Sequence, residues 1–301
     1  MQDDDAALIL ALHLTPEAWG ACYNPGMNRF VDLHIHTTAT PHHSSWEPER
    51  LAATAAHLGF YALAATDHNT TASVAALQAA GQRHGVRVIS GVEIDSAFGG
   101  KLWHTLVYGA PPDAPALLAL CATVFERNAA DAQALLADLP QQGFCLTGLN
   151  NLGRPPNVAD VATALARQNN LPGRVPGEGD EAAGMRYLLT RMPGAYKPIG
   201  VDEVIAVARQ LGAVAILAHP GRSKGIYAIP ADADDLAALV EAGLDGIEVY
   251  YPSHSAEQQD FLLRAAQRYG LLISGGSDSH HPHQDLARIE RSFMTLLDRV
   301  P

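Results

Sequence analysis

The chain has 301 residues, which is enough for one large domain or for a large domain with a smaller insert. With 20 Lys and Arg against 32 Asp and Glu, the net charge is −12, which disfavours binding to long nucleic acids and to membrane surfaces. A hydrophobic content of 48% excludes a disordered chain. The three cysteines include no Cys-x-x-Cys pair, and neither a signal peptide nor a membrane span is indicated. We therefore expect a soluble globular protein of the reducing cytoplasm.

Along most of the chain, apolar runs of strand length alternate with segments that have the apolar spacing of helices. The strands are expected at residues 30–35, 61–65, 86–94, 97–108, 213–218, 245–250 and 271–275. The helices are expected at residues 45–58, 70–84, 114–139, 201–211, 232–242 and 255–269. This alternation predicts an α/β fold with a parallel sheet and crossover helices.

The middle of the chain departs from this alternation. Residues 150–200 contain four clusters in which Pro is followed by Pro or Gly, with two short amphipathic stretches between them. We predict a small inserted, mainly helical subdomain here, which would form a lid. Residues 29–301 would then form the main domain, and residues 1–28 an N-terminal extension.

Eleven of the 14 histidines fall in or beside five short clusters. His34 and His36 are two residues apart on a predicted strand, so their side chains point to the same face. Five further candidate metal ligands occupy comparable strand-end positions: Glu93, His104, His219, Asp278 and His280. Mixed His and carboxylate ligands suit Zn, Mn, Fe or Ni rather than Ca. Because the candidates come from at least six strands, a closed barrel fits better than an open sheet.

Five short motifs occur in a fixed order along the chain. They are Asp32-Leu33-His34-Ile35-His36-Thr37, Thr66-Asp67-His68-Asn69, Gly91-Val92-Glu93-Ile94, Ala218-His219-Pro220-Gly221 and Ser277-Asp278-Ser279-His280. Singly each is weak, but together they make residues 29–301 resemble the PHP (polymerase and histidinol phosphatase) phosphoesterases. The resemblance implies a distorted (β/α)7 barrel that holds three divalent metal ions. Mn²⁺ is the favoured ion, and Zn²⁺ or Fe are alternatives.

The resemblance also implies a ligand set for each ion. The first ion would be held by His34, His36, Glu93 and Asp278. The second would share Glu93 and add His104 and His219. The third would be held by His42, His68 and His280. Asp32 and Asp67 are expected to orient the ligand histidines from behind.

One position departs from the commonest pattern of the family. Pro41 stands where many members carry an Asp. Thr40-Pro41-His42 is similar to the variant found in histidinol phosphatases, in which a His one position later takes its place. We favour His42 as the third-site ligand, and His43 is the competing assignment.

The same resemblance implies the chemistry. Metal ions would neutralise a phosphate ester and lower the pKa of bound water towards ~7. A hydroxide that bridges the first two ions would attack phosphorus. Asp278 and His219 would act through the ions that they bind, and His254 is a candidate to protonate the leaving oxygen.

Residues beside the motifs are candidates for binding the substrate. Arg222 follows the His219 motif directly, and we expect it to contact phosphate. Arg154 opens the insert, where a phosphate contact and a solvent-exposed charge are equally reasonable interpretations. Ser253 and His254 lie after another predicted strand and would face the same mouth of the barrel.

The insert narrows the substrate class. Phe125-Glu126-Arg127-Asn128, Gly153-Arg154-Pro155 and Ala195-Tyr196 look like the family subgroup that acts on nucleotides. That subgroup removes phosphate from nucleoside 3′,5′-bisphosphates or trims short RNAs from the 5′ end. Pro156 stands where the subgroup commonly carries His, so the resemblance leaves the substrate within this class open.

We therefore predict a metal-dependent phosphoesterase that acts on a small phosphomonoester, with a nucleotide favoured over histidinol phosphate. Two other classes of function compete with this interpretation. An inactive metal-binding module would be expected to lose ligands, and all nine are retained. An amidohydrolase acting on C–N bonds would need a bridging lysine, for which Lys101 and Lys197 are poorly placed.

Overall fold

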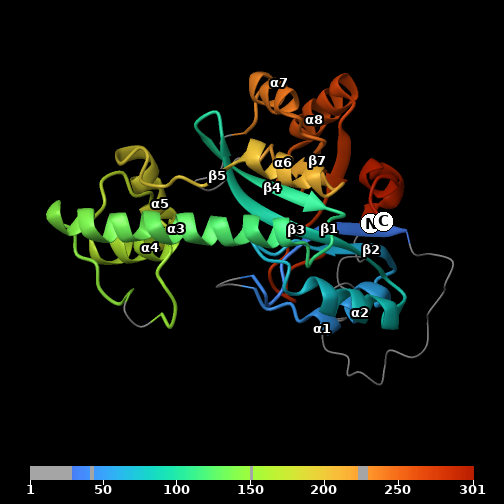
Figure 1. The fold of residues 1–301 in the computed structure, drawn as a ribbon, viewed down its shortest axis with the longest axis horizontal. Helices are drawn as coiled ribbons and strands as arrows, with labels where there is room; N and C mark the ends of the chain where they lie inside the picture. Colours follow the sequence, from blue (N-terminus) through green and yellow to red (C-terminus); the bar gives the residue numbers. More distant parts are fainter. Residues whose placement is uncertain (1–28, 41–43, 150–151, 223–229) are drawn as a thin grey trace, which may run out of the picture.

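The computed structural model describes residues 29–40, 44–149, 152–222 and 230–301. Within these ranges one sheet has the strand order β8-β7-β6-β4-β3-β2-β1-β9, and β5 pairs with β3 (Figure 1). The strands are β1 (Phe30–Ile35), β2 (Phe60–Ala65), β3 (Arg87–Phe98), β4 (Lys101–Tyr108), β5 (Ile199–Gly200), β6 (Val214–Leu217), β7 (Gly246–Tyr250), β8 (Leu272–Gly275) and β9 (Ile289–Glu290). The helices are α1 (Pro48–His57), α2 (Val74–His84), α3 (Pro115–Gln141), α4 (Val158–Gln168), α5 (Asp180–Arg191), α6 (Val201–Gln210), α7 (Ala233–Ala242) and α8 (Ala256–Tyr269).

The sheet curls until the segment after β8 meets β1. The amide of Asp278 donates to the carbonyl of His34 at 2.8 Å, and the amide of His36 donates to the carbonyl of Ser279 at 2.9 Å. We call this pair of hydrogen bonds the seam. It nearly closes the sheet into a barrel, so the predicted α/β barrel is confirmed.

One strand runs against the predicted direction. β4 is antiparallel to both β3 and β6, whereas the alternation of strands and helices predicts a parallel sheet throughout. The reason is the connection between β3 and β4, which consists of Gly99 and Gly100, both with positive φ. A parallel connection needs a crossover of about a dozen residues or more, so this short turn forces a hairpin.

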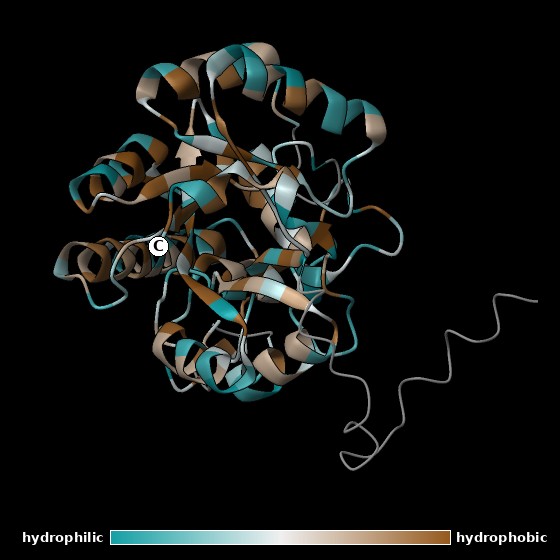
Figure 2. Cartoon of the chain, turned by 90° about the vertical axis from the view of Figure 1, so that its right-hand side faces the viewer, coloured by the Kyte–Doolittle hydropathy of each residue, from teal (hydrophilic) through white to brown (hydrophobic). Residues whose placement is uncertain are grey.

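Side-chain alternation along the strands separates the barrel interior from the helix layers. Ala62 and Ala64 of β2 pack in a cluster built from strands and the C-terminal segment, with no residue from α1–α8 among its buried members. Leu63 lies between them and packs instead with Leu51 of α1. Figure 2 shows the result: the central strands are rich in hydrophobic residues, and the surrounding helices carry both hydrophobic and hydrophilic stretches.

Helix α3 belongs to two hydrophobic cores. Leu117 and Val124 in its first half pack with residues of the barrel strands and of α6 and α7. Leu135 and Leu139 in its second half pack with α4 and α5. α3 therefore carries a small helical unit beside the barrel (Figure 1), and we call residues 144–198, which contain α4 and α5, the insert.

Local sequence explains how the insert helices form and pack. α4 begins at a capping box, in which Asn157 and Asp160 each accept a hydrogen bond at 2.8 Å from the other residue's backbone amide. α5 packs closely on α4 at Gly184, where an added Cβ would collide with the backbone of Ala162. Among the described helices, none is both long and apolar enough to cross a membrane.

Candidate metal centre

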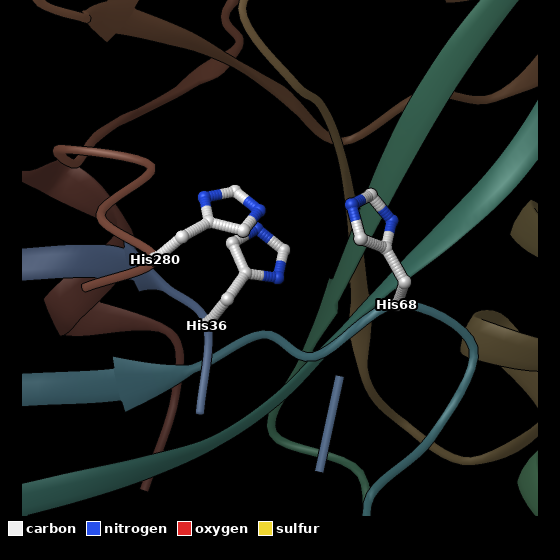
Figure 3. A group of neighbouring side chains, drawn as sticks. All are labelled: His36, His68 and His280. Carbon is white, nitrogen blue, oxygen red and sulfur yellow. The ribbon is translucent and has the colours of Figure 1, made fainter. Parts of the chain in front are cut away.

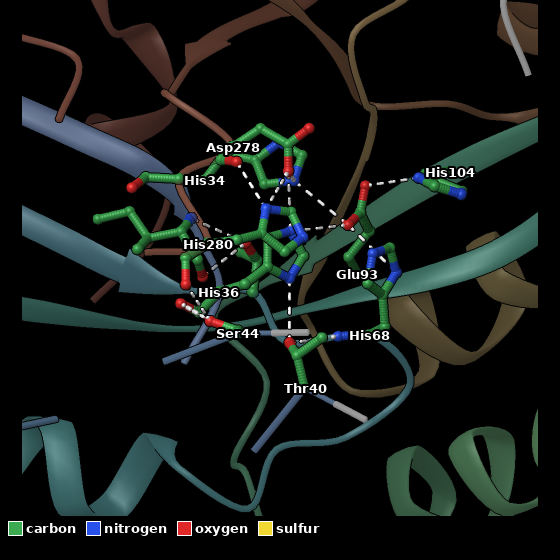
Figure 4. A network of polar contacts seen from close by, with 12 residues as sticks. His34, His36, Thr40, Ser44, His68, Glu93, His104, Asp278 and His280 are labelled. Atoms are coloured by element: carbon green, nitrogen blue, oxygen red, sulfur yellow. Dashed lines mark hydrogen bonds and ion pairs between the residues drawn. The ribbon is translucent and has the colours of Figure 1, made fainter. Parts of the chain in front are cut away.

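Polar side chains from six strands, or from the residues that follow them, come together at one mouth of the barrel. Figure 4 shows most of them. Parallel strands deliver theirs at their carboxyl ends, as His34 and His36 show at the end of β1. His104 lies in the first half of β4, yet it reaches the same mouth because β4 runs antiparallel to β3. The direction of β4, which the sequence did not predict, is therefore what places His104 in the cluster.

Glu93 lies at the centre of this cluster. Its Oε2 is 3.3 Å from His34 Nε2, 3.2 Å from His36 Nε2 and 3.3 Å from His68 Nδ1. Its Oε1 is 2.9 Å from His104 Nδ1 and 3.3 Å from His219 Nε2. One carboxylate thus faces five imidazoles, which is the position that a bridging ligand between two ions would occupy.

The structure groups the ligand atoms into four overlapping sets, each with all its atoms within 4.8 Å of one another. Two of these sets coincide with the ligands expected for the first and second ions. The sets are His34, His36, Glu93 and Asp278; Glu93, His104 and His219; His36, His68 and His280; and His68, Asp95 and His104.

The third expected set is only partly visible. His68 and His280 both lie against the ring of His36, at centroid distances of 4.6 Å and 4.1 Å (Figure 3). His42 and His43, the two competing assignments for the remaining ligand, lie outside the described residues. The described part of the site therefore supplies His36, His68 and His280 as its third group.

The residues present fit a divalent cation. His34 Nε2, His36 Nε2 and Glu93 Oε2 are buried and make no hydrogen bond. Leaving such atoms buried without a hydrogen bond is costly, and a buried charge costs more than a neutral group. Imidazole nitrogens and carboxylate oxygens aimed at a common point are the donor set of Zn, Mn or Fe sites.

The pKa values of His36 and Glu93 also indicate that this part of the cluster favours positive charge. Burial lowers the pKa of His36, but the neighbouring Asp278 and Glu93 outweigh it and raise the pKa to about 9. Burial raises the pKa of Glu93, but His34, His104 and His68 hold it well below its usual range. The neighbouring carboxylates thus raise the pKa values of His34, His36 and His104, whereas burial lowers those of His219 and His280. A bound cation would take the place of the protons on the first three.

Two contacts fix the ring orientation of the first histidine pair. The Nδ1 of His34 lies 3.2 Å from both carboxylate oxygens of Glu248. The Nδ1 of His36 lies 3.1 Å from Thr40 Oγ1, which donates to Asp67 at 2.6 Å. With each Nδ1 engaged from behind, each Nε2 is turned toward the centre of the cluster.

Asp95 is a site residue that the sequence analysis missed. Its Oδ1 lies 3.1 Å from His68 Nδ1, and its Oδ2 accepts from Asn69 Nδ2 at 2.9 Å. The amide of Asp95 donates in turn to Asn69 Oδ1 at 3.0 Å. The signal was present, because Asp95 follows Glu93 by two residues on the same strand and so shares its face.

Residues with strained backbone conformations also lie at the metal cluster. Of the described non-glycine residues, Asn69, His219 and Asp278 have positive φ, at 54°, 31° and 55°. All three stand where a strand ends at the cluster. Positive φ is costly for side chains other than Gly and persists where the surroundings enforce it, as at ligand-holding positions.

His254, which the sequence suggested as a proton donor, has both ring nitrogens in hydrogen bonds to the backbone. Its Nδ1 donates to the carbonyl of Val249 at 2.8 Å, and its Nε2 accepts from the amide of Gly221 at 3.0 Å. Both ring nitrogens of His254 are therefore engaged by the backbone. His254 therefore anchors the loop after β6, and neither it nor the exposed Ser253 lines the cavity described next.

A cavity of about 620 Å³ extends from the cluster to the insert. Arg222 lines it at the cluster end, where its guanidinium lies 4.0 Å from Asp278 Oδ2. Arg154 lines it at the insert end, but both of its terminal nitrogens donate to Asp160, at 2.6 Å and 3.0 Å. The two arginines expected to bind the substrate thus lie in one cavity, and the charge of Arg154 is already balanced.

Comparisons with known proteins identify relatives of this chain. The sequence model of the PHP domain matches residues 32–176. A phosphoribosyl 1,2-cyclic phosphate 1,2-diphosphodiesterase of Eggerthella lenta is 32% identical over 259 residues, which cover 83% of this chain and 93% of that protein. A 3′,5′-nucleoside bisphosphate phosphatase of Chromobacterium violaceum is 30% identical over 257 residues, which cover 84% of this chain and 87% of that protein.

A solved structure has the same fold over most of its length. It is described as an amidohydrolase from Chromobacterium violaceum with bound sulfate and no metal, and it is 27% identical to this chain with a TM-score of 0.64. The match covers 85% of this chain and 89% of that one.

Proposed function

This chain belongs to the PHP family of metal-dependent phosphoesterases, and on that premise we propose that it hydrolyses a small phosphomonoester of the nucleotide class. A nucleoside 3′,5′-bisphosphate or a mononucleotide is the substrate that we favour. Three divalent ions, with Mn²⁺ favoured over Zn²⁺ or Fe, would be the cofactors. The first ion would be held by His34, His36, Glu93 and Asp278, and the second by Glu93, His104 and His219. The third would be held by His68 and His280, with His42 as the remaining ligand.

One observation carries this proposal. Three buried ligand atoms without a hydrogen bond, on His34, His36 and Glu93, meet at the end of a cavity that also contains the guanidinium of Arg222. A divalent cation and a phosphate are the two charged groups that would complete this arrangement. A cavity of 620 Å³ has the size of a small-molecule site, which suits a nucleotide rather than a long nucleic acid.

Ions held in this cluster would neutralise the phosphate and activate water for attack on phosphorus. The residues of the chain hold and orient the reacting groups. Tyr251 donates to Asp278 Oδ2 at 2.9 Å, so Oδ1 remains turned toward His36, 3.0 Å from its Nε2. Burial and the charge of Asp278 raise the pKa of Tyr251, which keeps its hydroxyl as a donor. Arg222 stands where it can donate to a phosphate oxygen.

A second candidate is hydrolysis of a cyclic phosphate diester on a phosphorylated ribose. The specific observation in its favour is the Eggerthella lenta relative, which is named for that activity and is 32% identical to this chain. The same metal cluster would serve either reaction, because both begin with attack on a phosphorus atom.

Phosphate release from the purified, Mn-loaded protein tests the proposal. The substrates are a nucleoside 3′,5′-bisphosphate, a mononucleotide, a phosphoribosyl cyclic phosphate, histidinol phosphate and a short RNA, with His34→Ala as the control. We expect the highest kcat/KM for the nucleotide and no activity in the control. Turnover of the cyclic phosphate alone would favour the second candidate, and no turnover of any substrate by metal-loaded protein would contradict both.

A further inference from the structure

The two ends of the cavity differ in charge. At the cluster end, Arg222 faces the place where metal ions and a phosphate would meet. At the insert end, Arg154 is balanced by Asp160, and Glu181 adds a further carboxylate to the lining. Among the described residues that line the cavity, no other Lys or Arg is present. The insert end therefore has no net positive charge with which to hold a second phosphate.

The insert end is lined instead by flat apolar surfaces. Phe125 of α3 lies in this lining with the rings of Pro155 and Pro156. Phe125 is 45% exposed, and among the large hydrophobic side chains that the described chain exposes it is the one that lines this cavity. An exposed aromatic ring inside a concave site is unusual for packing alone, and it is available to a ligand.

Polar groups stand around this apolar surface. The amide of Asn128 and the carboxylate of Glu181 belong to the same lining. A heterocyclic base is apolar on its faces and forms hydrogen bonds at its edges. It would therefore match both the apolar and the polar residues that line this end of the cavity. A second phosphate lacks the apolar faces, and a carboxylate such as Glu181 would repel it.

We propose that the insert end of the cavity is a subsite for the heterocyclic base of the substrate, with Phe125 as the surface on which the base stacks. This inference rests on the proposed function and adds to it an orientation and a substrate class. The phosphate that is hydrolysed lies at the metal cluster. The base lies at the other end of the cavity, against Phe125, between α3 and the insert. Substrates that carry a base are therefore preferred over phosphorylated ribose without one.

The experiment compares a matched pair of compounds on the full-length, Mn-loaded protein. The pair is adenosine 3′,5′-bisphosphate and 1-O-methylribose 3,5-bisphosphate, which differ in the base. Turnover is measured as kcat/KM for both compounds. Binding is measured separately by calorimetry with non-hydrolysable phosphonate analogues of the same pair. Stacking of a base on an aromatic side chain predicts a preference of about tenfold or more for the compound with the base.

Three variants test whether the preference for the compound with the base comes from Phe125. Phe125→Ala should reduce the ratio between the two compounds about tenfold, through KM rather than kcat, and Phe125→Tyr should restore it because the ring is kept. Leu118→Ala is the matched control, since Leu118 is seven residues earlier on the same helix, is 46% exposed and does not line the cavity. It should leave the ratio at the wild-type value.

The two readouts separate this inference from the proposed function. A base preference in binding without any turnover would support the subsite and contradict the proposed phosphoesterase activity on this substrate. Turnover without a base preference would leave the proposed activity standing and overturn the subsite. Equal loss of the ratio in Phe125→Ala and Leu118→Ala would also overturn it, because the effect would not then come from the cavity.

Discussion

At the barrel mouth, three buried polar atoms of His34, His36 and Glu93 face one another without a hydrogen bond. In the insert, several charged side chains pair with one another instead. Arg154 pairs with Asp160, and Arg174 pairs with Asp180 at 2.7 Å. The two regions lie at opposite ends of one cavity, and among the described residues the buried ligand atoms without a hydrogen bond lie at the barrel mouth.

This difference indicates that the two regions contribute to function in different ways. A cation would complete the barrel mouth, so we expect activity to follow the occupancy of the site by metal. The insert is complete as it stands, so its contribution comes from the shape and the apolar surface that it presents. Changes at the mouth should therefore abolish or strongly reduce hydrolysis, whereas changes in the insert should alter local stability or substrate preference.

The largest effect is expected at Glu93. Glu93→Gln keeps the shape of the side chain but removes the charge that faces five imidazoles, so kcat/KM for phosphate release should fall by about 10³-fold or more. Metal content measured by mass spectrometry should fall in the same variant. Full metal content together with wild-type turnover would show that Glu93 is not a shared ligand.

A smaller effect is expected at Glu248, which contacts His34 from behind and also accepts from the amide of His219 at 2.8 Å. Glu248→Gln should reduce metal affinity or activity by about 10–100-fold, because ring orientation is weakened while every ligand remains. A competition titration with a chelator measures the affinity. Glu257→Gln, on the exposed start of α8, is the matched control and should behave as wild type.

Asp95 should show an effect confined to part of the cluster. Asp95→Asn weakens the contact to His68 and one of the reciprocal hydrogen bonds to Asn69, so activity should fall by about tenfold. The loss should be concentrated in the ion that His68 binds, with the ions of the first two sets retained. Metal stoichiometry measures this directly. Loss of all bound metal would contradict a local role for Asp95.

The smallest effect on turnover is expected in the insert. Gly184→Ala forces α5 away from the backbone of Ala162, which should destabilise this helix pair by about 1–3 kcal/mol. Hydrogen exchange should rise in α4 and α5 and stay unchanged in β1–β3. Gly179→Ala is the control, because an added Cβ there meets nothing within 4 Å. A rise in exchange throughout the barrel would mean that the two cores are not separable.

Much of the fold was predictable because periodicity marks element boundaries well. The helix predicted at 255–269 is found at Ala256–Tyr269, and the strand predicted at 271–275 at Leu272–Gly275. Strand direction was not predictable in the same way. Alternation of strands and helices predicts parallel strands, but it does not give the direction of a strand that follows another strand directly. β4 is that case, and the turn at Gly99-Gly100 was its only local signal.

The site shows the same division. His34, His36 and Glu93 lie together in the structure, as the alternation of side chains along their strands indicated. His254 also follows a strand, but both of its ring nitrogens contact the backbone, at Val249 and Gly221. A hydrogen bond to Gly221 spans 33 positions of sequence, and no local pattern announces it.

The seam of the barrel has a consequence for how the protein is made. Ser277 and His34, whose segments it joins, are 243 residues apart in the sequence. At a synthesis rate of about 5–20 residues per second, β1 leaves the ribosome on the order of 10–50 s before the segment that completes it. Until then the nascent chain holds His34 and His36 but lacks Asp278 and His280. A chain that ends before Asp278 therefore lacks two of the candidate ligands, so the full cluster can form only after the C-terminal segment has been made.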